Sequence, residues 1–299
     1  MDFYSNGKVL LTGEYAVLNG ALSLALPSIY GQYLEVKNNE SSFIKWNSFN
    51  SDQKVWFSCK LNKDSLDVVS SSSNKISNDL KKIINSIRDI KGDFLRINGT
   101  EVNTKLTFNK SWGLGSSSTL INNLANFAKI DPYDLNDKIF NGSGYDIACA
   151  RSNSSLLFKI EGSKRKIEEV SFDPPFKDNL YFVYLNKKEN SLKEIKRFKA
   201  INNQKKYLKE ISSITNQIVS CIDQIKFNSL IKEHEYFISK MISKETIKNK
   251  LFYDFKGEIK SLGAWGGDFI LVSSTKDPSR YFMDKGFNKI FKYNELIMN

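Results

Sequence analysis

Alternating and helically spaced apolar residues divide the first third of the chain into short elements. Residues 41–70 alternate between apolar and polar positions, which predicts antiparallel strands with one face in water, and residues 94–108 alternate again. Residues 75–91 carry apolar side chains at helical spacing and predict an amphipathic helix. Residues 7–36 contain short apolar runs joined by an Asn-Gly pair, so we expect strands linked by a tight turn there.

The rest of the chain continues this mixture of helices and strands. Further helices are predicted over residues 118–129, 131–140, 229–242 and 278–285, and further strands over 155–160, 167–172, 180–185, 269–273 and 290–293. Another helical stretch places on one face Leu208, Ile211, Ile214, Ile218, Ile222 and Ile225. Such stripes are typical of core packing. An Asp-Pro-Pro sequence at 173–175 marks a junction, so we expect domains over residues 1–175 and 176–299.

Composition and charge narrow the class of protein. The 299 residues are 40% hydrophobic and 13% aromatic, which favours a globular protein over a disordered one. No apolar run is long enough to span a membrane, and the first residues do not resemble an export signal, so we expect a cytoplasmic protein. The formal charge of +11 comes from lysines scattered among acidic residues, without an arginine-aromatic patch. We therefore expect neither a nucleic-acid nor a membrane partner.

Cysteine and histidine are too few for several kinds of chemistry. The three cysteines, Cys59, Cys149 and Cys221, are widely separated, which fits reduced thiols. The one histidine, His234, stands among charged residues in a helical stretch, so we expect it at the solvated surface. Histidine-based catalysis and metal sites with several imidazoles are therefore not expected.

A glycine-serine segment at residues 111–120 offers the clearest chemistry. Its Gly-Leu-Gly-Ser-Ser-Ser sequence precedes apolar residues at helical spacing, which predicts a loop that turns into a helix. Glycines allow successive N–H groups to point at one anion, and a helix N-terminus adds further donors. Two interpretations are open on the residues alone: a phosphate-binding loop, or an ordinary loop with a serine cap. The Gly-Lys-Ser/Thr ending of a Walker loop is missing.

Three other segments carry charges or glycines whose roles the residues alone leave open. Lys8 and Glu14 stand in apolar sequence, either facing solvent from a half-buried strand or forming an acidic-basic pair at a site. Asp146 follows a Gly-Ser-Gly turn, where an aspartate can also act as a helix cap. Residues 263–268 hold three glycines and a final aspartate, which predicts a tight turn.

Taken in order, these segments resemble the motifs of the GHMP kinase superfamily, named for galactokinase, homoserine kinase, mevalonate kinase and phosphomevalonate kinase. The matching segments are Gly7-Lys8-Val-Leu-Leu-Thr-Gly13-Glu14-Tyr15-Ala-Val-Leu, Gly113-Leu-Gly-Ser-Ser-Ser118 and Gly263-Ala-Trp-Gly-Gly-Asp268. The resemblance implies a two-domain α+β fold with mixed or antiparallel sheets, helices packed on one side, and a ferredoxin-like C-terminal domain.

Details within the motifs resemble the mevalonate and phosphomevalonate kinases. The Gly-Glu-Tyr-Ala-Val form is one such detail, and the segment Gly142-Ser-Gly-Tyr-Asp146-Ile-Ala is similar to that of phosphomevalonate kinases. Two positions depart from the family pattern. Trp265 stands where the family usually has glycine, which requires a wider loop or a ring lining the pocket. Leu135, flanked by Asp134 and Asp137, stands near the place of a magnesium-binding glutamate, which leaves the second metal ligand open.

The resemblance implies ATP-dependent phosphoryl transfer to a small acid or its phosphate, with ATP and Mg²⁺, by a monomer or homodimer. It assigns nucleotide binding to Gly113, Leu114, Gly115, Ser116, Ser117 and Ser118, with Ser117 also on the metal, and substrate binding to Glu14, Gly144 and Gly266. Asp146 and Lys8 would form the catalytic pair. Lys187 or Lys188 would matter more if the acceptor is a phosphate. The alternatives are a kinase for another small alcohol or sugar, and a non-catalytic nucleotide-binding homologue.

Overall fold

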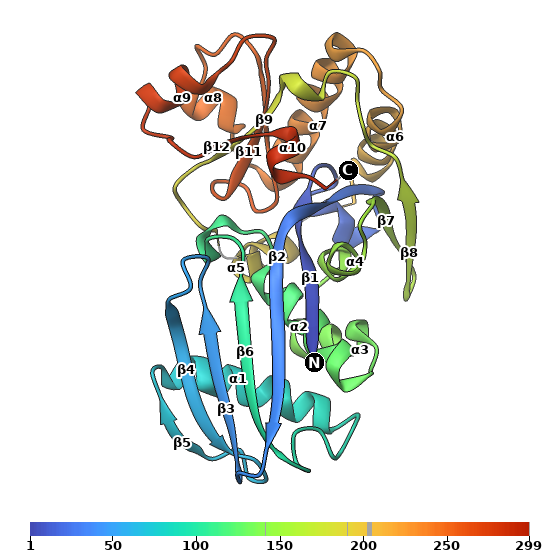
Figure 1. The fold of residues 1–299 in the computed structure, drawn as a ribbon. Coiled ribbons are helices and arrows are strands. Elements are labelled where there is room, and N and C mark those ends of the chain that lie inside the picture. Colours follow the sequence, from blue (N-terminus) through green and yellow to red (C-terminus); the bar gives the residue numbers. More distant parts are fainter. Residues whose placement is uncertain (141, 190, 202–204, 299) are drawn as a thin grey trace. The chain divides into compact units, whose positions relative to one another are not determined.

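The computed structural model describes residues 1–140, 142–189, 191–201 and 205–298, and its chain divides into two compact units (Figure 1). Unit 1 is formed by Met1–Gly7, Tyr30–Lys110 and Leu114–Arg151, and unit 2 by Lys8–Ile29, Ser111–Gly113 and Ser152–Asn299. Each unit is thus assembled from separated segments. The domain boundary predicted between residues 175 and 176 stays a prediction.

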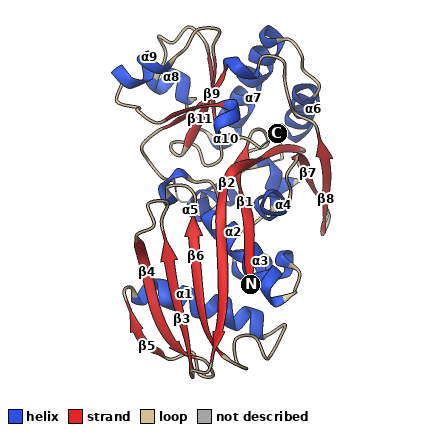
Figure 2. Ribbon diagram, viewed as in Figure 1, coloured by secondary structure: helices blue, strands red, loops and turns tan. Residues whose placement is uncertain are grey.

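Unit 1 packs helices on one face of a sheet (Figure 2). Its elements are β3 (Phe43–Phe49), β4 (Val55–Asn62), β5 (Val68–Ser71), α1 (Asn74–Arg88), β6 (Gly99–Leu106), α2 (Ser116–Ala128), α3 (Pro132–Ile139) and α4 (Tyr145–Arg151), together with parts of β1 (Asp2–Leu10) and β2 (Ser23–Asn39). The strand order is β5-β4-β3-β6-β2, and β1 pairs with β2. The pairing of β3 with β6 is parallel, whereas β3–β4, β4–β5 and β6–β2 are antiparallel.

The apolar core of unit 1 lies between that sheet and its helices. Alternate residues of the strands, such as Ile44, Trp46 and Val102, face residues of α1 and α2 such as Ile84 and Leu124. These side chains are almost fully buried. The alternation and the helical spacing in the sequence therefore report which face of each element enters the core.

Unit 2 contains the four-stranded antiparallel sheet β10-β11-β9-β12, the strands β7 and β8, and several helices. Its elements are η1 (Ala16–Asn19), η2 (Lys110–Trp112, whose first residue is in unit 1), β7 (Ser155–Glu161), β8 (Lys164–Val170), η3 (Lys177–Asn179), β9 (Leu180–Tyr184), α5 (Ser191–Lys199), α6 (Leu208–Val219), α7 (Gln224–Ile242), α8 (Ile247–Leu251), β10 (Glu258–Ser261), β11 (Phe269–Ser273), α9 (Ser279–Asp284), β12 (Ile290–Lys292) and α10 (Tyr293–Leu296). β7 pairs with the first part of β2 and with β8.

The four strands β10-β11-β9-β12 form the ferredoxin-like part that the resemblance implies. Their order, with helices between β9 and β10 and between β11 and β12, is that of a β-α-β-β-α-β unit, and the pairings are antiparallel. The mixed α+β class and the helices on one side of the sheet are confirmed. No helix among the described residues is both long and apolar enough to cross a membrane.

One predicted helical stripe is wrong at its end. α6 stops at Val219, and Asp223 caps α7 by accepting a hydrogen bond of 2.7 Å from the N–H of Lys226. The break rotates the chain, so Ile222 and Ile225 are 79% and 78% exposed and do not belong to the core. An aspartate that caps a new helix overrides an apolar spacing that would otherwise continue.

Candidate active site

The predicted phosphate-binding loop turns into α2 at Ser116. Gly115 precedes the helix with a φ of 91°, a left-handed angle that favours glycine. The Ser118 hydroxyl donates a hydrogen bond of 2.8 Å to the Gly115 carbonyl, which closes the turn, while Ser117 is exposed. The first N–H groups of a helix have no intrahelical acceptor, so the backbone of residues 116–118 offers donors to an anion.

Leu114 supplies the apolar side of this loop. Its side chain is 1% exposed, and a Cβ on Gly7 would lie 2.9 Å from its carbonyl oxygen. Gly7 of the first motif therefore lets β1 approach the loop closely in unit 1.

Gly113 lies against the side chain of Asp268 in unit 2. It has a φ of 69°, and a Cβ there would lie 2.6 Å from Oδ1 of Asp268 and closer still to Cγ. The backbone of Asp268 is fixed by hydrogen bonds of 2.6 Å to the Lys187 carbonyl and 2.8 Å from the Leu185 N–H. Its Oδ1 accepts a further bond of 3.2 Å from the N–H of Glu189. The third motif thus contacts the first glycine of the predicted phosphate-binding loop.

Lys8 is an electrostatic neighbour of Asp268. It lies half-buried on β1, within unit 2. Burial raises the pKa of the Asp268 carboxyl, and the positive charges of Lys8 and Lys188 oppose this rise. Residue patterns gave Asp268 no role beyond ending a tight turn. In the sequence, the position of Asp268 directly after three closely spaced glycines was the feature that could have singled this residue out. In the structure its backbone has a left-handed φ of 52°.

Asp146 stands in the first turn of α4, in unit 1. It is half-buried, and its Oδ1 accepts a hydrogen bond of 3.1 Å from the N–H of Ile147. Gly144, with a φ of 90°, makes the turn that leads into this helix, and its carbonyl accepts a bond of 3.1 Å from the N–H of Ala148. The first turn of α4 therefore holds the Asp146 carboxylate, while its catalytic role and its pairing with Lys8 stay predictions.

A magnesium ion at the predicted phosphate-binding loop would need water molecules and phosphate oxygens as most of its ligands. Leu135 is fully buried in the core of unit 1, whereas Asp134 and Asp137 are exposed. Among the described residues, no group of three or more His, Cys, Asp or Glu side chains could hold a metal. Mg²⁺ commonly keeps several waters and substrate phosphate oxygens as ligands. The exposed hydroxyl of Ser117 at the start of α2 therefore fits as one ligand of such an ion.

Trp265 packs into the apolar core of unit 2. It is 3% exposed and belongs to a cluster with Tyr15, Phe198 and Met241. Its backbone N–H donates a hydrogen bond of 3.1 Å to the Tyr15 hydroxyl. The flanking glycines, Gly263 and Gly266, have left-handed φ values of 59° and 109°. The turn therefore accommodates the ring by folding it into the core.

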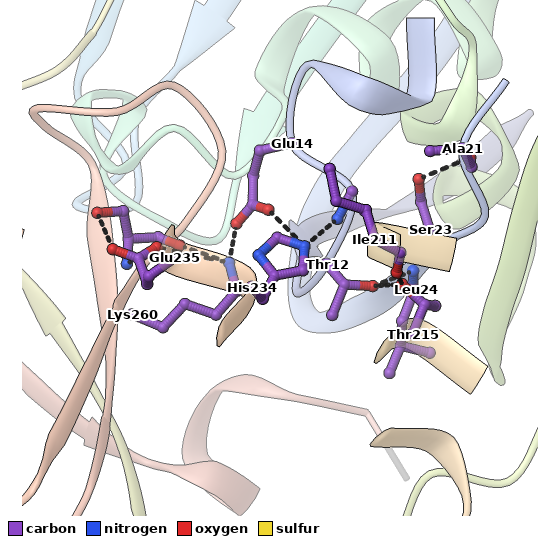
Figure 3. Close-up of polar contacts among 12 residues, drawn as sticks. Thr12, Glu14, Ala21, Ser23, Leu24, Ile211, Thr215, His234, Glu235 and Lys260 are labelled. Carbon is purple, nitrogen blue, oxygen red and sulfur yellow. Dashed lines mark hydrogen bonds and ion pairs between the residues drawn. The ribbon is translucent and has the colours of Figure 1, made fainter. Parts of the chain in front are cut away.

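A cluster of charged and polar side chains lies in the interior of unit 2 (Figure 3). Glu14, His234 and Lys260 are each 0% exposed, and Glu235 is 2% exposed. Glu14 forms an ion pair with Lys260, and the N–H of Gly13 donates a hydrogen bond of 2.9 Å to Nε2 of His234. The Glu14 carboxylate therefore has an internal partner, Lys260. Substrate binding by Glu14 stays a prediction.

The expectation that His234 is solvated is wrong. Lys232 and Glu233 beside it are exposed, but His234 occupies the other face of α7. The signal was present in the apolar stripe of this helix, which runs through Phe227, Leu230, Ile231, Ile238 and Met241. Helical spacing places residue 234 within this stripe. Charged neighbours in sequence were a weaker guide than periodicity.

Comparisons with known proteins give the fold a name. No protein-family model matches the sequence, and no curated protein matches it. The mevalonate kinase of Methanococcus jannaschii is similar in structure, with a TM-score of 0.67 at 18% identity over 100% of this chain and 98% of that one. Streptococcus pneumoniae phosphomevalonate kinase, in complex with phosphomevalonate and AMPPNP, gives 0.68 at 15% identity over 100% and 98%. Lactococcus lactis galactokinase, complexed with galactose, gives 0.65 at 13% over 97% and 92%. The chain has the fold of the GHMP kinase superfamily.

Proposed function

We propose that the chain is an ATP-dependent kinase that phosphorylates a small acid of the mevalonate-pathway type, phosphomevalonate or mevalonate. The observation that carries the proposal is the turn of residues 113–118 into α2, with left-handed glycines at its start and an exposed Ser117 hydroxyl. The fold supports it, because similar structures are small-molecule kinases and one contains an ATP analogue. The motif details around Tyr15 and Asp146 support the choice of acceptor.

Phosphoryl transfer requires positioning and positive charge more than covalent chemistry. The N–H groups of residues 116–118 would bind the phosphate chain, and Lys8 would stabilise negative charge on the transferred group. Asp146 would accept the proton of an acceptor hydroxyl, a contribution of about 10²–10⁴-fold. Mg²⁺, when bound, neutralises charge on the phosphates, and Ser117 would hold it. The backbone at Gly144 and Gly266 would contact the acceptor.

The test is a panel of acceptors assayed with ATP and Mg²⁺: phosphomevalonate, mevalonate, homoserine, galactose and related sugars. We expect transfer to one of the first two, and a loss of kcat of roughly 10²–10⁴-fold in Asp146→Ala with little change in ATP affinity. Asp79→Ala is the matched control, because Asp79 is an exposed carboxylate on α1 of the same unit. Undiminished turnover in Asp146→Ala would contradict the catalytic assignment.

If the acceptor is a phosphate, a base is less necessary because the attacking oxygen is already ionised. Positive charge then matters more. Lys188 acts electrostatically on Asp268, and Lys187 forms an ion pair of 2.5 Å with Glu189. We therefore expect Lys188→Met to raise KM for phosphomevalonate more than KM for ATP. With a phosphate acceptor, we also expect the loss of kcat in Asp146→Ala to lie nearer 10²-fold, roughly the lower end of the range for general base catalysis.

A second candidate is a non-catalytic nucleotide-binding homologue. Leu135 favours it, since a core leucine occupies the neighbourhood of the glutamate that mevalonate kinases place on magnesium. Calorimetry would then detect ATP binding, while no acceptor in the panel would be phosphorylated. Transfer to galactose alone would instead favour a kinase for another small alcohol or sugar.

A further inference from the structure

Three consecutive residues after β1 are fixed by side chains from three different elements of unit 2 (Figure 3). Thr12 Oγ1 accepts a hydrogen bond of 2.8 Å from Thr215 of α6. The next residue, Gly13, donates its N–H to His234 of α7, and Glu14 pairs with Lys260 of β10. These three contacts to residues distant in sequence hold the loop of residues 12–14 in one conformation.

The backbone of this loop is strained at Tyr15, next to the anchored residues. Gly13 has a φ of 84°, and a Cβ there would collide with Ser23. Tyr15, a bulky residue, has a φ of 59°. Left-handed angles at such residues cost free energy and persist only where surrounding contacts impose them. The partners of residues 12–14 supply those contacts.

The ion pair of Glu14 with Lys260 is buried beside His234 and Glu235, and burial raises the pKa of Glu14 while the positive charge of Lys260 opposes this rise. Lys260 Nζ contacts Glu14, donates a bond of 2.9 Å to the Ser261 carbonyl, and lies 3.9 Å from Glu235 Oε1. Burial raises the pKa of Glu235 to about 8, so this carboxyl is mostly protonated at neutral pH. A buried charge that loses its partner is strongly destabilising, so we expect removal of Lys260 alone or of Glu14 alone to loosen the loop.

His234 serves as a hydrogen-bond acceptor. An imidazole that accepts at Nε2 is neutral and carries its proton on Nδ1. Burial and the nearby charge of Lys260 lower the pKa of His234 well below its ordinary value, which keeps this form. His234 is completely buried, so its effect on a ligand passes through the Gly13 backbone.

We infer that Lys260 and His234 are positioning residues, which hold the loop of residues 12–15 and, through the Tyr15 hydroxyl, the turn that contains Trp265 and Gly266. Glu14 then acts through this loop and does not contact the acceptor. The inference deepens the proposed function and rests on it, because Gly266 is proposed to contact the acceptor and Asp268 of the same turn contacts Gly113. Tyr15 is the link, since its hydroxyl accepts the Trp265 N–H.

The first experiment compares Lys260→Met, Glu14→Gln and the double variant by steady-state kinetics and hydrogen–deuterium exchange. Each single variant leaves a buried charge unpaired, so we expect faster exchange in residues 11–18 and 262–268 and an increase in acceptor KM of about tenfold or more. The double variant removes both charges, so exchange and KM should return most of the way to wild type. If exchange recovers but KM stays at the Glu14→Gln value, the carboxylate contacts the acceptor and the inference is overturned.

The second experiment compares His234→Phe with His234→Gln, which retains an acceptor. The phenylalanine variant should show faster exchange in residues 11–18 and a raised acceptor KM at unchanged ATP affinity, and the glutamine variant should recover both. Glu233→Gln, on the exposed face of α7, is the matched control. Unchanged exchange in both His234→Phe and Lys260→Met would overturn the inference. Hydrogen–deuterium exchange can be measured without catalysis. A chain that phosphorylates no acceptor would therefore refute the proposed function, while the exchange data would still test whether Lys260 and His234 anchor the loop.

Discussion

Replacement of Gly113 by alanine tests whether the third motif shapes the proposed nucleotide-binding loop. The new methyl group would lie 2.6 Å from Oδ1 of Asp268 and closer to Cγ, on a backbone with a φ of 69°. The left-handed angle alone costs about 1–2 kcal/mol for an alanine. Displacement of the Asp268 carboxyl also loses its hydrogen bond from Glu189, worth about 1 kcal/mol. We therefore expect a loss of about 2–3 kcal/mol, or a fall in Tm of roughly 4–8 °C.

The assay is thermal unfolding followed by circular dichroism, together with ATP affinity by calorimetry. Gly92→Ala is the reference, because Gly92 is exposed and no atom lies within 4 Å of the position that a Cβ would take there. In an Asp268→Gly background the cost of Gly113→Ala should fall to the backbone strain of about 1–2 kcal/mol. Equal losses in both backgrounds, or a Gly113→Ala melting point near that of Gly92→Ala, would refute the reasoning.

Three further predictions concern the interior and the metal. Glu235 has a pKa of about 8 in the folded chain against about 4.3 unfolded, so folding retains its proton and stability is lost as pH rises from about 4 to 8. The melting-point difference between Glu235→Gln and wild type should therefore grow in favour of the variant over this range, and a constant difference would contradict the raised pKa. Leu135→Ala should cost about 2–5 kcal/mol, and Leu135→Glu should cost more without improving Mg²⁺ affinity, as shown by thermal melts and metal titration. Ser117→Ala should raise the Mg²⁺ concentration for half-maximal activity about tenfold at nearly unchanged stability, because its side chain is exposed; an unchanged magnesium dependence would remove Ser117 as a ligand.

Local patterns in the sequence predicted most of the elements, because a single face of each element enters the core. The alternation around Trp46 and the helical spacing around Ile84 correspond to β3 and α1. The loop before α2 was also predictable, since glycine and serine requirements are local. Short elements such as β10 and α8 were missed, because four or five residues do not establish a period.

The partners of the charged residues could not be predicted from such patterns. The sequence around Glu14 does not indicate Lys260, which is 246 positions away and lies in a strand without a clear alternation. Trp265 stands where the family usually has glycine, and the sequence does not show how the turn accommodates its ring. The packing of α5 and α7 residues around the ring explains how it is buried. Long-range pairing is set by the packing of whole elements, which a single sequence without that packing does not display.

The anchoring of residues 12–15 has a consequence for the order in which the protein matures during synthesis. The hydrogen bonds and ion pair of this loop join positions separated by 203, 221 and 246 residues, so they close only near the end of translation. At an elongation rate of about 5–20 residues per second, the first motif waits some tens of seconds for β10 to leave the ribosome. The first motif is therefore translated early but reaches its final conformation only after β10 has been made.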